Sequence, residues 1–111
     1  MKKLLTTCVG FCLAWTVQAQ FNPQKEIDYC ATQALKTIQS LPADGHGNNI
    51  PRSIDKDKTT WRLVDYKDWC SGFWSGSLWY LYEGTQKSVF KAQAERFDKQ
   101  LKPLSHEKAY D

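Results

Sequence analysis

The stretch 68–83 constrains the fold most strongly, because it carries three tryptophans and two tyrosines in one short run. From 73 to 82 it is apolar almost throughout, which is typical of a helix buried on most of its sides. Gly72 and Gly76 stand four residues apart, so in a helix they leave a strip without side chains where another backbone or a ligand can approach. The run therefore predicts a helix that is both a core element and a binding surface.

Three helices are predicted, and the aromatic helix is the middle one. Asp68 suits its N-cap, and Gly84 suits the position just after its last residue. A third helix is expected over residues 88–101, with Thr85 or Ser88 as its cap and Pro103 as its stop. One face of this third helix is apolar: Phe90, Ala94, Phe97 and Leu101.

The first helix is expected over residues 22–41. Asn22 suits its N-cap, Pro23 suits its first helical position, and Pro42 stops it. Apolar residues recur there at the spacing of one helical face: Ile27, Cys30, Ala31, Ala34, Leu35, Ile38 and Leu41.

Residues 42–67 read as a long loop with many glycine, proline and asparagine residues and room for short extended pieces around 59–64. Long loops in compact domains are more often functional than idle. No strand pattern competes with the three helices. We therefore predict an all-α fold.

Composition and charge exclude some classes of function. The 111 residues are 41% hydrophobic and 14% aromatic, which is enough for one small globular domain. The formal net charge is +3, from 15 basic and 12 acidic side chains. Lys2 and Lys3 are two of the basic ones, so the rest of the chain is close to neutral. No cluster of lysine or arginine follows the aromatic run, so we expect no nucleic-acid partner.

The first 19 residues have the three parts of a secretory signal peptide. The start is positive (Met-Lys-Lys), residues 4–17 form the apolar run, and residues 17–19 (Val-Gln-Ala) form the cleavage site. We expect cleavage after Ala19 and a mature chain, 20–111, in the periplasm without a membrane anchor. An uncleaved anchor is the alternative, but the apolar run is short for a membrane span.

Cleavage would leave Cys30 and Cys70 as the cysteines of the mature chain. An oxidising compartment permits a disulfide between them, whereas the place of Cys30 on an apolar helical face suits a small buried hydrophobe. No Cys-x-x-Cys or His-x-x-x-His spacing occurs, so we expect no metal site.

Residues 68–83 also resemble the signature of a known family. They read D-W, then G-F-W-S-G, then L-W-Y-L-Y-E, and the family signature is D-W-x-x-G-F-(W/F)-x-G-x-L-W-x-x-Y-E. This signature lies near the start of unsaturated glucuronyl hydrolases, glycoside hydrolase family 88. Residues 50–53 (I-P-R-S) resemble the P-R-S element that precedes it in bacterial members. With the first helix, the resemblance covers nearly the whole mature chain.

The resemblance implies a fold, a reaction and a substrate. The family fold is an (α/α)6 barrel of twelve helices, which needs on the order of 300 residues. We therefore expect residues 20–111 to be the N-terminal portion of a catalytic domain that is incomplete, and inactive, in this chain alone. The reaction releases an unsaturated uronic acid from lyase-generated oligosaccharides: C4 of the enol ether is protonated, water adds at C5, and the hemiketal opens. It needs no metal and no cofactor.

The resemblance also implies roles for individual residues. The principal acid is an aspartate of an H-D-(I/L)-G-F motif, which we expect just after Asp111. Trp69 matches the tryptophan that lines the sugar subsite, where an indole face covers ring C–H groups, and a core position is the alternative. Arg52 suits a substrate carboxylate or sulfate, or else a salt bridge that braces the loop. Asp68 is interpreted as a cap or loop-bracing carboxylate rather than as a catalytic residue.

Other large or titratable residues have plainer interpretations. Trp74 and Trp79 are interpreted as core residues of the aromatic helix, and His46 and His106 as solvated. Two further functions stay open, namely a non-catalytic helical-hairpin module that binds a glycan or a protein, and a related unsaturated rhamnogalacturonyl hydrolase. A repeat module would show self-similarity between its helices, and these three helices show none.

Export of the protein should remove residues 1–19, because small residues precede the predicted cleavage point. N-terminal sequencing or intact mass of exported material should then give a chain that starts at Gln20. A product that keeps Met1 and stays in the membrane fraction would contradict the signal-peptide prediction.

Overall fold

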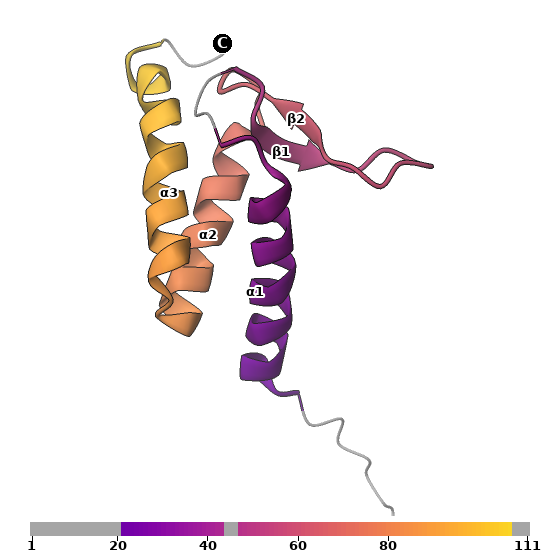
Figure 1. Cartoon of the computed structure of the whole chain (residues 1–111). Helices are drawn as coiled ribbons and strands as arrows, with labels where there is room; N and C mark the ends of the chain where they lie inside the picture. Colours follow the sequence, from indigo (N-terminus) through magenta and orange to yellow (C-terminus); the bar gives the residue numbers. More distant parts are fainter. Residues whose placement is uncertain (1–20, 44–46, 108–111) are drawn as a thin grey trace, which may run out of the picture.

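The computed structural model describes residues 21–43 and 47–107 (Figure 1). The predicted signal peptide, His46 and Asp111 therefore lie outside the described residues. α2 lies between α1 and α3, and two short strands project from one end of the three helices (Figure 1). None of the described helices is long and apolar enough to cross a membrane. In chain order the elements are α1 (Pro23–Ser40), β1 (Ile50–Ser53), β2 (Arg62–Val64), α2 (Ser71–Thr85), α3 (Ser88–Leu101) and the 3-10 helix η1 (Lys102–His106).

α1 begins where the sequence predicts. The Asn22 side chain accepts a hydrogen bond from the backbone N–H of Lys25 at 3.3 Å, and Pro23 fills the first helical position. α1 ends at Ser40, shortly before Pro42. Its buried residues recur at helical spacing along one face: Ala31, Ala34 and Thr37.

A two-stranded antiparallel sheet corrects the all-α prediction. β1 pairs with β2 so that Ile50 lies opposite Val64. These two side chains are 1% and 8% exposed and belong to the core. β-branched residues suit a half-buried pleated surface, which explains why a segment without a long alternating pattern forms strands. The extended pieces expected at 59–64 include β2, whereas β1 was not predicted.

α2 and α3 pack together through fully buried side chains. Leu78 of α2 and Phe90, Ala94 and Phe97 of α3 are each 0% exposed. The ring of Trp74 lies edge-on to that of Phe97, with 6.3 Å between the centroids. This contact forms the centre of the core.

A single carboxylate links the two helices at the edge of this contact. Asp98 of α3 accepts hydrogen bonds from the Ser75 hydroxyl and from the indole N–H of Trp79, the latter at 2.8 Å. Trp79 also lies edge-on to Tyr82, with ring centroids 6.2 Å apart. Trp74 and Trp79 thus both pack against the core, as predicted.

The predicted caps of α2 and α3 are wrong by a few residues, whereas α3 spans Ser88–Leu101, as expected. Cys70 is the N-cap residue of α2, so Asp68 lies outside the helix. α2 continues through Gly84, and Gln86, with φ 56°, takes the left-handed conformation that ends it. Lys87 occupies the N-cap of α3 without a side-chain cap.

Gly84 lies where α1 comes close to α2. A Cβ atom at this position would lie only 2.9 Å from Cγ2 of Ile27. A Cβ atom at Gly72 or Gly76 would meet nothing within 4 Å in the described structure. The close approach therefore occurs at Gly84, and the predicted glycine strip faces open space.

One face of α2 is also open. Phe73 and Tyr80 are 66% and 77% exposed. They are seven residues apart and therefore lie on the same helical face. For the described part of the chain, the prediction of a helix buried on most sides is wrong, because α1, α3 and β1 leave the face with Phe73 and Tyr80 uncovered.

Gly84→Ala should destabilise the complete protein, although alanine is the better helix former by about 1 kcal/mol. The new methyl group would meet Ile27 Cγ2 at 2.9 Å, and overpacking of this kind costs about 1 to 3 kcal/mol. In an Ile27→Ala background the same change should be neutral or stabilising. Chemical denaturation of the four proteins measures both effects, and stabilisation in both backgrounds would contradict the close approach.

Candidate functional site

Trp69 lies in the turn that joins β2 to α2. Its side chain is 73% exposed, so in the described chain it is not a core residue. Its ring meets Phe73 edge-on, with centroids 6.0 Å apart and planes at 85°. An edge-on neighbour leaves a face of the indole accessible. Trp69 and Phe73 together are called the aromatic pair below.

Arg52 lies on β1 and reaches the turn beside Trp69. Its Nε atom lies 3.3 Å from Oδ2 of Asp68, and the two side chains are 25% and 19% exposed. Of the two alternatives for Arg52, the structure therefore shows the loop-bracing salt bridge. Contact between Arg52 and a substrate carboxylate or sulfate stays a prediction.

The other carboxylate oxygen of Asp68 holds the backbone that follows Trp69. Oδ1 of Asp68 accepts a hydrogen bond from the backbone N–H of Cys70 at 2.9 Å. This hydrogen bond first, and then the charge and hydrogen bond of Arg52, lower the pKa of Asp68 below its ordinary value of 3.8, while desolvation opposes them. Asp68 is thus ionised at neutral pH and braces the turn, as interpreted from the sequence.

Further hydrogen bonds close the turn on both sides of the tryptophan. Asp65 accepts the backbone N–H of Lys67 on Oδ1 at 2.9 Å and the backbone N–H of Asp68 on its carbonyl oxygen at 3.3 Å. The Ser71 hydroxyl donates to the carbonyl oxygen of Tyr66 at 2.9 Å. The exposed indole therefore rises from a backbone that is tied down before and after it.

The row of exposed aromatic rings was missed by the sequence reasoning. Phe73 and Tyr80 stand two helical turns apart on α2, and this spacing signals a shared face, while Trp69 in the preceding turn meets Phe73 edge-on. What the sequence lacks is any signal that this face, rather than another apolar face of α2, stays open.

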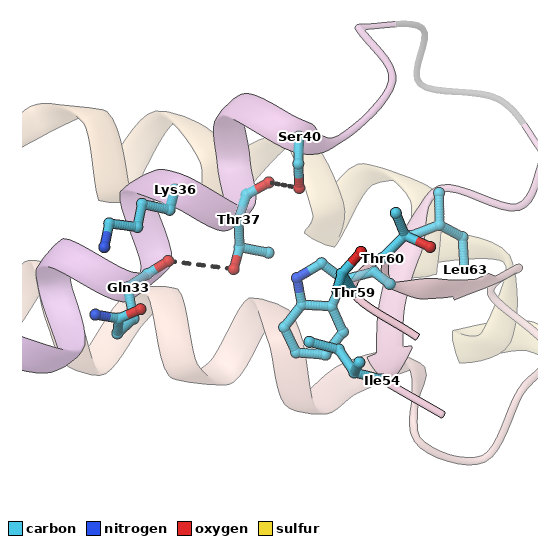
Figure 2. A pocket seen from close by; sticks show the side chains of 9 residues that line it. Gln33, Lys36, Thr37, Ser40, Ile54, Thr59, Thr60 and Leu63 are labelled. Carbon is cyan, nitrogen blue, oxygen red and sulfur yellow. Dashed lines mark hydrogen bonds between the residues drawn. The ribbon is translucent and has the colours of Figure 1, made fainter. Parts of the chain in front are cut away.

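Two hollows open beside α1, and neither is lined by Trp69 or Arg52. The first, of about 450 Å³, lies between α1 and the segment 54–63 (Figure 2). The hydroxyls of Thr37 and Ser40 on its wall donate to backbone carbonyls of α1 (Figure 2). The second, of about 400 Å³, is apolar and lies between α1 and α2. Its aromatic lining is Tyr29, Trp61, Trp74 and Tyr80.

Of the interpretations made for the cysteines, the buried position of Cys30 is wrong. Cys30 is exposed, Cys70 is half-buried, and both are free, so the structure shows neither a disulfide nor a buried Cys30. Cys30 instead lines the apolar hollow between α1 and α2. His106 is exposed at the end of η1. Among the residues described, no group of three or more histidine, cysteine, aspartate or glutamate side chains can hold a metal ion.

Three curated proteins match the chain. It is 40% identical over 50 residues to an unsaturated glucuronyl hydrolase of Formosa agariphila, which covers 45% of this chain and 12% of that protein. It is 31% identical over 78 residues to an unsaturated chondroitin disaccharide hydrolase of Streptococcus pyogenes, with 70% and 19% covered. A protein of the same description from Streptococcus pneumoniae is 26% identical over 73 residues, with 66% and 18% covered.

These matches confirm the resemblance stated from the sequence. The chain spans only 12% to 19% of the length of these relatives. No family model matches the chain, and no solved structure does. The structure establishes a mostly helical fold, whereas the place of these helices in a barrel stays a prediction.

The stability that Asp68 contributes should depend on pH in the acid range. Because its pKa is lowered in the folded protein, the contribution is present above the ordinary value of 3.8 and is lost as the pH falls through the folded-state value. Asp68→Asn keeps an acceptor for the Cys70 N–H but loses the charge. It should lower the melting temperature at about pH 7, and the difference from wild type should shrink towards about pH 3. A difference that stays constant across this range would contradict the ionic role.

Proposed function

We propose that this chain, as a relative of the unsaturated glucuronyl hydrolases, forms part of an enzyme that releases unsaturated uronic acid from lyase-generated oligosaccharides. The names of its relatives describe hydrolases of unsaturated glucuronyl groups and of unsaturated chondroitin disaccharides. In this proposal residues 20–111 supply the first helices of an (α/α)6 barrel. The predicted signal peptide directs the protein to the periplasm.

The exposed indole of Trp69 is the observation that supports the proposal. A sugar ring carries C–H groups on its faces and hydroxyl groups around its rim. An indole that covers one face of the ring leaves the hydroxyls free for hydrogen bonds. Trp69 is 73% exposed and has an edge-on neighbour in Phe73, so it has a face available for such a contact.

Enol-ether hydration also needs an acid that is protonated near neutral pH, and desolvation among apolar neighbours can provide one. Asp68 does not meet this requirement, because the Cys70 N–H and Arg52 lower its pKa. In the proposed reaction the acid protonates C4, water adds at C5, and the hemiketal opens to release the neighbouring sugar. The resemblance assigns the acid to an aspartate just after Asp111, outside the described residues.

Trp69→Ala in the complete protein should lower kcat/KM for an unsaturated uronyl disaccharide about tenfold, mainly through KM. A stacking platform contributes on the order of 1 to 2 kcal/mol, and about 1.4 kcal/mol corresponds to a tenfold change. Trp69→Phe should recover part of the loss, because the smaller ring still covers the sugar face. Loss of the enol-ether absorbance follows the kinetics, and the melting temperature reports on the fold.

Trp79→Ala is the matched control, because Trp79 packs against the core and donates to Asp98 at 2.8 Å. It should destabilise the protein by roughly 3 to 5 kcal/mol and lower activity through lost soluble protein. If Trp69→Ala behaves in this way and its surviving fraction keeps normal KM and kcat, Trp69 is a core residue.

Turnover of an unsaturated rhamnogalacturonyl substrate alone would favour the related hydrolase family.

A further inference from the structure

The contacts that hold Trp69 in place converge on one carboxylate. Asp68 precedes Trp69 and Cys70 follows it. Oδ1 of Asp68 accepts the Cys70 N–H at 2.9 Å, while Oδ2 lies 3.3 Å from Nε of Arg52. A single side chain therefore ties the backbone on both sides of Trp69 to β1.

Arg52 provides a fixed anchor for this carboxylate. It lies on β1 two residues after Ile50, which is 1% exposed, and directly after the buried Pro51. β1 is paired with β2 and contacts α2, so the arginine backbone is held relative to the core. The Arg52 and Asp68 side chains are only 25% and 19% exposed, and water screens such a pair less than one on the open surface.

An exposed indole needs such an anchor if it is to serve as a platform. A large apolar ring in water gains free energy by lying down on nearby apolar surface, and Phe73 with the rest of the open face of α2 offers such a surface. A ring that moves freely also loses rotamer freedom when a ligand stacks on it. A backbone fixed on both sides of Trp69 opposes the collapse of the ring onto α2. It also reduces the rotamer freedom that the ring would lose when a ligand binds.

We propose that Arg52 is a positioning residue for the sugar subsite, holding Trp69 through Asp68 in the orientation that receives the ligand without touching the ligand itself. This inference rests on the proposed function and gives Arg52 a different task from direct contact with a substrate carboxylate or sulfate. Nε of the Arg52 guanidinium already pairs with Asp68 at 3.3 Å. The contact through which Arg52 affects substrate binding is therefore its ion pair with Asp68, inside the protein.

A double-mutant cycle in the complete protein separates positioning from direct contact. Arg52→Gln should raise KM for an unsaturated uronyl disaccharide about fivefold, with kcat changed by less than about twofold. In a Trp69→Ala background the same change should have little further effect on KM, because the ring that Arg52 positions is absent. Additive effects on KM would overturn the proposal and indicate that Arg52 acts on the substrate by itself.

Matched variants exclude a general effect on the fold. Arg62→Gln removes an exposed arginine from β2, the partner strand, and should leave KM unchanged. Arg52→Lys keeps the charge and should recover part of the loss. Asp68→Asn keeps the acceptor for the Cys70 N–H but loses the ion pair, and it should reproduce the effect of Arg52→Gln. If Arg52→Gln fails to fold, Arg52→Lys and Asp68→Asn carry the same cycle with Trp69→Ala.

A spectroscopic readout tests the positioning without any substrate. In fluorotryptophan-labelled protein, the fluorine resonance of Trp69 is assigned by its loss in Trp69→Phe. Arg52→Gln should shift or broaden this resonance, and Arg62→Gln should not. An unchanged resonance would overturn the positioning role. Wild-type protein that turns over no unsaturated disaccharide would refute the proposed function alone, and the spectrum would still decide the role of Arg52.

Discussion

α2 is apolar on nearly every side, yet α1, α3 and β1 of the described chain leave one of its faces uncovered. α3 covers one side through Leu78, Phe90 and Phe97, which are fully buried. α1 covers another side, where Gly84 lets Ile27 approach. The remaining face carries exposed aromatic rings. Which faces of α2 are buried therefore decides both where the core lies and where a binding surface remains.

Local signals in the sequence predict local structure well. α1 starts at Asn22 and Pro23 because its cap needs only neighbouring residues. The places of Trp74 and Trp79 against the core also follow from their position in the body of an apolar helix. Gly84 was misread as a helix stop because its real constraint is the side chain of Ile27, which lies on another helix. β1 escaped prediction for a similar reason, since its strand character depends on pairing with β2.

The candidate site, too, is predicted from the sequence where the signals are local and not where they depend on tertiary contacts. The family signature is enough to single out Trp69, because the order of large residues and glycines around it is specific. The sequence leaves two tasks open for Arg52, and only the approach of β1 to the turn decides that Asp68 is its partner. The hydrogen bond from the Cys70 N–H, and after it the approach of Arg52, lower the pKa of Asp68, so Asp68 is unsuited to be the acid of the proposed reaction. An aspartate paired with a cation and a backbone N–H gives up its proton too readily to deliver it near neutral pH.

The contacts of Asp98 influence the direction in which the exposed aromatic face of α2 points. Ser75 and Trp79, whose donors it accepts, are four residues apart and lie one above the other on α2. One carboxylate can accept from both donors only when α3 has one position along α2 and one rotation about its own axis. Phe73 and Tyr80 lie on the opposite side of the helix. These two hydrogen bonds, on the far side of α2 from Phe73 and Tyr80, thus constrain the direction in which the exposed aromatic face points.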